Sequence, residues 1–351
     1  MTKLLVLNDL HLGVQRMGGT TPASAEELRA YTQGMFHILL NRGTHVAING
    51  DMFDTHQVPT SELLNAYLTV TEWLLRRGEK LHLIPGNHDL SKNSANLSSF
   101  ELMARLLASQ FPDKVSYLAG GNWVDRDQGI YAISHVPNQD QFDVQLGTVP
   151  EEVRVLLLHC NYDNAFAAQA EHSLNLSRDQ AKVLTKRGIT LVLGHEHQHR
   201  VMMNDKVIIV GNQFPTSVSD CLGSGDKKYA LEIAGYDMEL IPTWSASDKE
   251  GFKQIDWDVL GTGDPVVAGF VRVTGVATAA QSADVIKAIS KYRQASDHFV
   301  VTNAVKVEGV QDMDTLAESV EDIRSVNVID LLLAELSAEQ QVVVRKLLES
   351  V

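Results

Sequence analysis

The stretch Leu81-His82-Leu83-Ile84-Pro85-Gly86-Asn87-His88-Asp89 begins as a short apolar run and ends abruptly in side chains that bind metals or move protons. Four other apolar runs rich in Val, Leu and Ile end in the same way. Parallel strands of an open α/β sheet present such side chains in the crevice beyond their carboxyl ends. The five strand ends therefore predict one composite site, made of Asp9 and His11, Asp51, Asn87 and His88, His159, and His195 and His197.

The segments between these runs predict the layers of the fold. Amphipathic stretches with apolar residues at helical spacing follow the first strands, at residues 25–41, 60–76 and 96–110. Further strands are expected after the last ligand pair, at residues 206–210, 229–233 and 238–241. The last two indicate a hairpin around Gly235 that closes a second sheet layer over the first. Strands that alternate with helices indicate an α/β fold, here a two-layered β-sandwich flanked by helices.

Composition limits the class of protein. Hydrophobic residues make up 44% and charged residues 21%, as is ordinary for a soluble globular chain. The net charge of -14 argues against gripping nucleic acid by net charge alone, although it leaves room for a local basic groove. Two cysteines fit a reducing cytosol rather than a disulfide framework. The first apolar run is too short for a signal peptide or a membrane span, so a cytoplasmic protein without membrane contact is expected.

The ligand types predict the chemistry. Asp, Asn and His supply oxygen and neutral nitrogen donors, which suit Mn²⁺, Fe²⁺ or Zn²⁺ better than Ca²⁺. Seven protein ligands are too many for one catalytic ion with open positions, but they suit two ions that share a bridge. Two ions about 3.5 to 4 Å apart can activate water near neutral pH and stabilise the charge of phosphoryl transfer. The predicted reaction is hydrolysis of a phosphate ester.

Five ordered motifs resemble those of the calcineurin-like metallophosphoesterases: Asp9-x-His11, Gly50-Asp51-x-x-Asp54, Gly86-Asn87-His88-Asp89, His159 after a strand, and Gly194-His195-x-His197. Leu12-Gly13 and Phe53-Asp54 further resemble the SbcD nuclease branch. The resemblance to that branch covers the whole length, and its phage members, the recombination endonuclease subunits, have a similar compact size. It implies the metallophosphoesterase fold, followed by a small α/β cap and C-terminal helices.

The resemblance also implies roles for single residues. Two ions, most simply Mn²⁺, would share Asp51, with Asp9, His11, Asp51 and His197 around one and Asp51, Asn87, His159 and His195 around the other. His88 would face the scissile phosphate and either stabilise its charge or protonate the leaving oxygen. Asp89 would orient His88 as a second catalytic residue. Asp54 is equally consistent with supporting the site and with capping a turn.

Four segments are expected along the chain. Residues 1–243 would form the metallophosphoesterase nuclease domain, and residues 244–264 a linker that begins rich in Ser, Thr, Asp and Lys. Residues 265–311 read as strand, helix and strand, and would form a cap that contacts DNA. Residues 312–351 would form C-terminal helices with more apolar surface than so short a segment buries alone. The resemblance implies that these helices dock on an SbcC-like coiled-coil ATPase.

The broad apolar faces of residues 60–76 and 96–110 leave two interpretations open. Both helices could simply pack on the sheet, or they could form a self-complementary homodimer interface.

Three functions are weighed. The first is a Mn²⁺-dependent duplex exonuclease and single-strand endonuclease, a subunit of an SbcCD-like complex in DNA end processing, repair and recombination. The second is a phosphodiesterase or phosphatase for small molecules or phosphoproteins. Against phosphoproteins, no arginine follows Asp54 and Asp89 replaces the glutamate of those phosphatases. The third is a metal-free scaffold, which retention of every ligand and of His88 disfavours.

Basic residues that could contact DNA phosphates are scattered along the sequence, at Arg16, Lys92, Arg126, Arg200, Lys227 and Lys228. With a net charge of -14, a nuclease of this kind would need different components to bind different parts of the DNA. The ions would bind the scissile phosphate, while a dimer and the ATPase would hold the remaining DNA.

Overall fold

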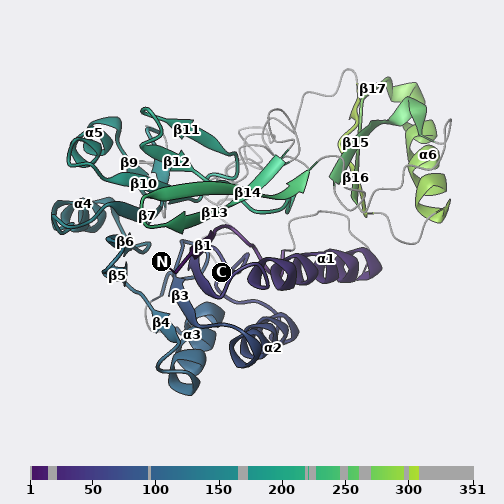
Figure 1. The fold of residues 1–351 in the computed structure, drawn as a ribbon. Helices are drawn as coiled ribbons and strands as arrows, with labels where there is room; N and C mark the ends of the chain where they lie inside the picture. Colours follow the sequence, from purple (N-terminus) through teal and green to yellow (C-terminus); the bar gives the residue numbers. More distant parts are fainter. Residues whose placement is uncertain are drawn as a thin grey trace, which may run out of the picture.

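Two six-stranded sheets pack face to face and carry helices on their outer surfaces (Figure 1). The computed structural model describes residues 2–14, 22–93, 96–164, 173–217, 220, 227–245, 252–260, 270–295 and 300–307. The sandwich predicted from the alternation of strands and helices is confirmed. Apolar residues of both sheets fill the space between them, among them Leu4, Val6, Ala47, Leu157, Val192 and Leu231.

The first sheet has the strand order β14-β13-β1-β2-β3-β4, that is Asp237–Ser245, Lys227–Ala234, Leu4–Leu7, His45–Asn49, Lys80–Ile84 and Val115–Tyr117. Strands β1 to β4 run parallel, so the residues that follow β1, β2 and β3 meet at one edge. The predicted hairpin β13–β14 exists, but it was wrongly expected to close the second layer. It extends the first sheet instead, because β13 pairs antiparallel with β1 and buries Leu231 and Ile233 beside that strand.

The second sheet has the order β11-β12-β10-β7-β6-β5, that is Arg200–Met202, Val207–Ile209, Thr190–Gly194, Val155–His159, Ile130–Ile133 and Gly121–Asp125. Strands β12, β10, β7 and β6 are parallel, whereas β11 and β5 pair antiparallel at the two edges. A short pair, β8 (Asn161–Tyr162) and β9 (Asn175–Leu176), lies beyond β7. The ligands that follow β7 and β10 therefore share one edge of this sheet.

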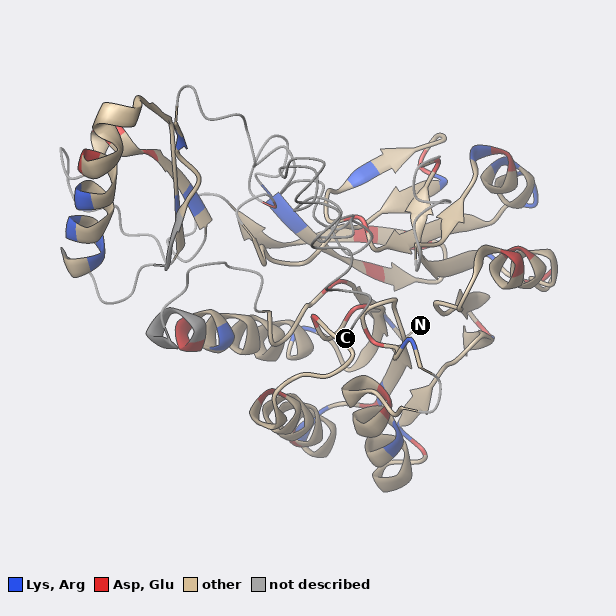
Figure 2. Ribbon diagram, turned by 180° about the vertical axis from the view of Figure 1, so that it is seen from behind, with Lys and Arg blue, Asp and Glu red and all other residues tan. Residues whose placement is uncertain are grey.

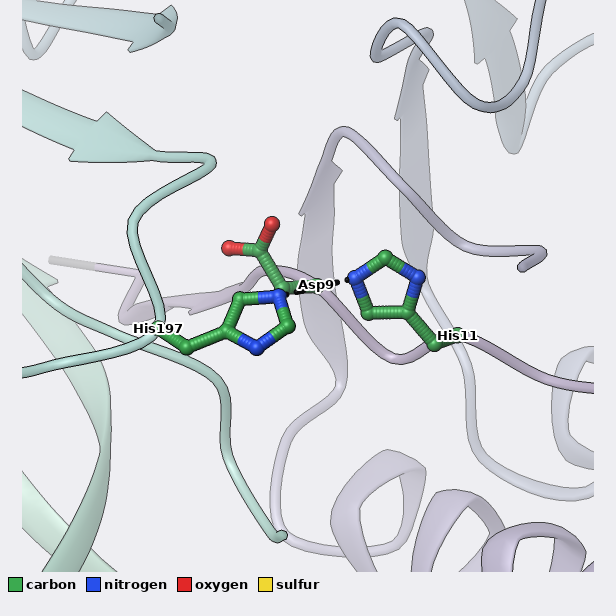
Figure 3. A group of neighbouring side chains, drawn as sticks. All are labelled: Asp9, His11 and His197. Atoms are coloured by element: carbon green, nitrogen blue, oxygen red, sulfur yellow. Dashed lines mark hydrogen bonds between the residues drawn. The ribbon is translucent and has the colours of Figure 1, made fainter. Parts of the chain in front are cut away.

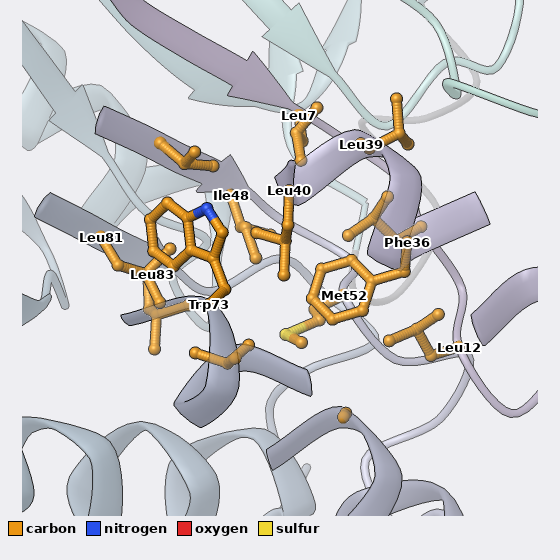
Figure 4. Packing of buried hydrophobic residues seen from close by; sticks show 14 of the residues in the cluster. Leu7, Leu12, Phe36, Leu39, Leu40, Ile48, Met52, Trp73, Leu81 and Leu83 are labelled. Carbon is orange, nitrogen blue, oxygen red and sulfur yellow. The ribbon is translucent and has the colours of Figure 1, made fainter. Parts of the chain in front are cut away.

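Three predicted helices pack against the first sheet: α1 (Pro22–Leu40), α2 (Thr60–Arg76) and α3 (Ser99–Gln110). Their buried faces meet the strands around Phe36, Trp73 and Ile48 (Figure 4). Helices α4 (Gln139–Gly147) and α5 (Arg178–Lys186) cover the second sheet and were not predicted. Among the described residues, no helix has the length and apolar character needed to span a membrane.

A smaller unit follows the sandwich. Strands β15 (Phe252–Asp256), β16 (Phe270–Thr274) and β18 (Val300–Asn303) form a parallel sheet, with 3₁₀ turns at Trp257–Val259 and Ala279–Gln281. Helix α6 (Ser282–Ala295) packs on it through Val285 and Ile289, and β17 (Val276–Ala277) pairs with β19 (Lys306–Val307). Strand β15 falls within the segment expected to be a linker, so this unit begins before residue 265. The C-terminal helices expected at 312–351 lie outside the described residues.

A buried histidine pair on β2 and β3 predicts a pH dependence of stability. His45 and His82 are each 6% exposed, and their Nε2 atoms lie 2.8 Å apart. Burial, then the charges of His45 and Lys80, lower the pKa of His82 to about 4. Because this pKa lies below the unfolded value of 6.5, the contribution is fully present above pH 6.5 and is lost as pH falls toward 4.

We expect the metal-free protein to lose about 3 kcal/mol of unfolding free energy through this group over that interval. Denaturant unfolding at several pH values measures it. His82→Gln should flatten the slope, whereas His37→Gln, at an exposed position on α1, should leave it unchanged. An equal slope in all three proteins would contradict the assignment.

Candidate metal centre

The seven predicted ligands converge where the strand ends of the two sheets meet. In the part of the chain that the structure describes, three groups have ligand atoms that all lie within 4.8 Å of one another, and two of them consist of predicted ligands: Asp9, His11 and His197, and Asp51, His159 and His195. The third joins His11 to Asp54 and His88. Asn87, the remaining predicted ligand, lies against the second group. The first group contains residues that follow β1 of the first sheet and β10 of the second. The second group contains residues that follow β2 of the first sheet and β7 and β10 of the second. Each group therefore combines residues from both sheets.

In the first group two imidazoles face each other through the same atom. His11 Nε2 lies 3.0 Å from His197 Nε2 (Figure 3). The opposite nitrogen of each ring faces a carboxylate: His11 Nδ1 is 3.3 Å from Asp54 Oδ1, and His197 Nδ1 is 2.9 Å from Asp220 Oδ1. Since a carboxylate only accepts, Nδ1 of His197 carries a proton, and Nε2 of its neutral ring has the lone pair. Two imidazole nitrogens beside the carboxylate of Asp9 form a candidate cation site.

The second group is organised around His159. Its Nδ1 donates to the carbonyl of Asn49 at 3.0 Å, which leaves Nε2 3.2 Å from Asp51 Oδ2 and 3.2 Å from Asn87 Oδ1. His195 Nδ1 lies 3.0 Å from the same Asn87 oxygen. Carboxylate, amide and imidazole donors thus surround a second position, and this donor set suits a divalent ion of intermediate hardness.

Burial and neighbouring charges shift the pKa values of the metal-free site strongly. Burial opposes charge at every group, yet the carboxylates of Asp51 and Asp9 raise the pKa of His159 to about 10. Burial, followed by the charge of His159, lowers the pKa of His195 to about 3. Burial would raise the pKa of Asp51, but His159, His88 and His11 hold it well below its ordinary value. The carboxylates of Asp51 and Asp9 stabilise a positive charge at this position, which in the metal-free protein is the proton on His159 and would otherwise be a divalent cation.

The carboxylate of Asp9 connects the two groups, and that of Asp51 connects the second group to His88. Asp51 contacts His159 through Oδ2, while its Oδ1 accepts from the backbone N–H of His88 at 2.9 Å. Both oxygens of Asp9 accept from the backbone N–H of His195, at 3.1 and 3.0 Å, and Oδ1 lies 3.9 Å from His159 Nε2. These contacts of Asp51 involve the second group and His88, and its predicted role as a bridge stays a prediction.

Four ligands adopt left-handed backbone conformations that L-residues rarely take. The φ angles of Asp9, His11, Asp51 and His195 are 49°, 45°, 50° and 85°. Hydrogen bonds between the loops hold this geometry: Asp9 N donates to Gly50 O at 3.1 Å, and His11 N donates to Asp51 O at 3.0 Å. Such conformations persist only where the surroundings enforce them, and they concentrate at functional sites.

Glycines in three motifs let the ligands approach the backbone. A Cβ on Gly50 would lie 2.0 Å from His159 Nδ1, and one on Gly86 would lie 2.2 Å from Asp51 Oδ1. At Gly194 the nearest atoms, the carbonyl of Asn49 and His159 Nδ1, would be 3.0 Å away. The glycines that precede the ligands are therefore required by close packing against the ligand side chains.

His88 and Asp89 do not interact as predicted. His88 Nδ1 donates to the carbonyl of Asp54 at 2.6 Å, and its Nε2 lies 4.0 Å from Asp51 Oδ2. Asp89 is fully buried and accepts from the backbone N–H groups of Gly86, Phe53 and Met52, at 2.9, 3.1 and 3.3 Å. The prediction that Asp89 orients His88 is wrong. Asp89 connects two ligand loops by hydrogen bonds, and the carbonyl of Asp54 orients the ring of His88.

Asp89 is itself affected by the site. Burial, then the charge of Asp51, raises the pKa of Asp89 to about 7, while the amides of Gly86 and Phe53 oppose that rise. Asp54, which was equally consistent with a turn cap, supports the site twice, through His11 and through His88.

Two residues near His197 were not recognised as supports of the site. Asp220 contacts its ring, and Lys228 donates from Nζ to its carbonyl at 3.1 Å. Lys228, expected as a DNA contact, is 1% exposed, and Arg200 pairs with Glu196. Asp220 follows His197 by 23 residues in a segment without periodicity, so no sequence signal marks it. His199 anchors a turn, with Nδ1 donating to the carbonyl of Ile209 at 2.9 Å.

The model of the Metallophos family, calcineurin-like phosphoesterase, matches residues 2–199. Because this match spans more than half of the chain, the protein belongs to the calcineurin-like phosphoesterase family, and it is a metal-dependent phosphoester hydrolase. The ligand residues present fit the two-cation site of such an enzyme.

The solved structures that resemble the chain include two with 12% sequence identity. One crystal structure shows 12% identity and a TM-score of 0.38, covering 69% of this chain and 99% of its own. The other, a dimetal phosphatase from Danio rerio (LOC 393393), shows 12% identity and a TM-score of 0.36, covering 70% of this chain and 97% of its own. These likenesses are too distant to support an argument about substrate. No curated protein matches the chain.

Proposed function

We propose that this phosphoester hydrolase is a Mn²⁺-dependent DNA nuclease, with duplex exonuclease and single-strand endonuclease activity of the SbcCD type. The observation that supports it most is the charge of helix α6 in the small unit. This helix holds three basic side chains, Lys287, Lys291 and Arg293, against one acidic side chain, Asp284. Figure 2 shows basic residues along α6 and on neighbouring strands of this unit. In a chain with a net charge of -14, this local excess suits phosphate backbones.

The small unit is anchored beside the metal centre. Val14, three residues after the ligand His11, packs with Leu28 of α1 and with Phe252 and Phe270 of the small unit. Tyr31 of α1 adds edge contacts to both phenylalanines, with ring centroids 6.4 and 5.8 Å away. The unit that carries α6 thus packs against the segment that follows a ligand loop, which supports a substrate that extends beyond the scissile phosphate.

The chain's own residues supply the remaining chemistry. When bound, two divalent ions activate water and offset the charge that develops on the phosphate. The Nδ1 proton of His88 is donated to the Asp54 carbonyl, so Nε2, which lies 4.0 Å from Asp51 Oδ2, is the ring atom that would exchange a proton with the substrate or stabilise its charge. The side chain of His88 is 27% exposed, whereas those of Asp51 and His159 are almost completely buried. His88 is therefore more accessible to a phosphate from solvent than Asp51 and His159 are.

The alternative is a phosphodiesterase or phosphatase for small molecules. The pairing of Arg200 with Glu196 and the burial of Lys228 favour it, because neither side chain is free to bind a long polyanion. A substrate series separates the two functions. We expect Mn²⁺ to support cleavage of linear duplex, single-stranded circles and a chromogenic phosphodiester. A variant with Lys287→Glu and Lys291→Glu should lose DNA cleavage and keep cleavage of the small ester. Cleavage of the ester alone by the wild type would favour the alternative.

We propose two protein contacts as well. An SbcC-like ATPase would dock on residues 312–351, a proposal that rests on sequence alone. A chain that ends at Asp312 should then lose ATPase association but retain ester cleavage. A homodimer through α2 and α3 is supported by exposed leucines beside the faces that pack on the sheet, namely Leu64, Leu68, Leu75, Leu102 and Leu106. A monomeric mass in sedimentation at micromolar concentration would count against the dimer.

A further inference from the structure

Asp220 is enclosed on one side by a set of hydrogen-bond donors. Its Oδ2 accepts from Asn212 Nδ2 at 3.0 Å, from Thr216 N and Oγ1 at 2.9 and 3.1 Å, and from Ser217 N at 3.0 Å. The residue is 5% exposed. Four donors satisfy Oδ2 completely, so only Oδ1 is directed toward the metal centre.

Oδ1 lies 2.9 Å from Nδ1 of His197. An ionised carboxylate oxygen only accepts, so this contact requires the proton of the neutral ring to be on Nδ1. Nε2 then carries the lone pair, and it is the atom that lies 3.0 Å from His11 Nε2 in the first group. Asp54 Oδ1 lies 3.3 Å from His11 Nδ1, a longer contact than that of Asp220 with His197.

We infer that Asp220 is a positioning residue, which holds His197 in the Nδ1–H tautomer and thereby leaves Nε2 to bind the cation of the first group. The inference rests on the proposed two-cation site. It differs from a merely structural role, in which Asp220 would only close the loop formed by residues 212–217.

Asp220→Asn distinguishes these roles because the four donors still require an oxygen at the Oδ2 position. The new amide nitrogen must then face His197 Nδ1, and a donor at that place forces Nδ1 to accept. The ring proton moves to Nε2 and blocks the ligand position. The loop keeps its hydrogen bonds, so the variant should fold. Removing such an outer partner of a metal-binding histidine typically costs about 10- to 100-fold in metal affinity.

Two measurements test the inference, with Asp205→Asn on an exposed turn as the matched control. Imidazole ¹⁵N spectra of the metal-free protein, recorded at about pH 8 where free histidine is neutral, should show Nδ1–H for His197 in the wild type and control, and Nε2–H in Asp220→Asn. Calorimetry with Mn²⁺ alone should show one of two binding events weakened about 10- to 100-fold.

An Nε2–H ring in the metal-free wild type would overturn the inference whether or not the variant folds. So would a variant with the wild-type tautomer and both affinities. A protein that binds two ions yet cleaves no DNA would contradict the proposed nuclease and leave the tautomer result unaffected.

Discussion

Replacing His88 with alanine is expected to reduce phosphodiester hydrolysis by about two to four orders of magnitude while both cation positions remain able to bind. The expectation follows from the contacts of the ring. Its Nδ1 donates to the Asp54 carbonyl and its Nε2 lies 4.0 Å from Asp51, and it belongs to neither of the two groups that hold six of the seven predicted ligands. The loss should therefore appear in turnover rather than in metal content.

Substrates with different leaving groups reveal which task His88 performs. If it protonates the leaving oxygen, the defect should shrink for a nitrophenolate, which departs without a proton. If it stabilises charge on the phosphate, the defect should be similar for every leaving group. Calorimetric ion counts accompany the rates, and His56→Ala, at an exposed position outside the motifs, is the control. Loss of an ion from His88→Ala would show that His88 is a ligand after all.

Gly50→Ala is expected to eliminate cation binding at the second group and to reduce activity at least about 100-fold. The new methyl carbon would lie 2.0 Å from Nδ1 and 2.4 Å from Cγ of His159, far inside contact distance. The φ angle of Gly50 is 89°, which penalises any side chain independently of space. His159 cannot yield easily, because Asn49 holds one ring nitrogen and Asp51 lies against the other.

Gly34→Ala is the matched control, since it places the same methyl group on α1 with no atom within 4 Å. Alanine within a helix should stabilise the protein by about 0.5 to 1 kcal/mol and leave activity unchanged. Thermal unfolding with and without Mn²⁺ and ion counting measure both variants. A Gly50→Ala protein that still binds two ions with wild-type affinity would disprove the packing argument.

The strand ends could be predicted because two signals coincide there. A buried parallel strand reads as a continuous apolar run, and its carboxyl end is the usual place for ligands. Thus β2 and β3 were predicted within one residue at each end, and Asp51 and Asn87 lie where expected, next to His159. Helix α2 was also predicted correctly, since its apolar residues follow helical spacing over four turns.

The elements that were missed carry weak signals for physical reasons. Helix α4 buries only Phe142 and Leu146, so its apolar periodicity is short. Helix α5 buries only Ala181 and Leu184, although its capping box at Ser177 and Gln180 is a usable sequence signal. Strand β4 has only three residues, so its sequence carries little alternation that would mark it as a strand.

The error at Asp89 has a different cause. Adjacency to His88 in sequence suggested contact, but successive side chains in the loop point apart. The carboxylate of Asp89 instead accepts hydrogen bonds from three backbone amides.

The division of the ligands between two sheets has a thermodynamic consequence. His11 and His197 are 186 residues apart, and their contact exists only when both halves of the sandwich are docked. A cation that binds the docked state and not the separated halves adds its binding free energy to their association. At a free concentration one hundred times its Kd, that addition is about 2.7 kcal/mol. Chelation would therefore loosen the whole sandwich, and metal supply would set the lifetime of the folded chain as well as its activity.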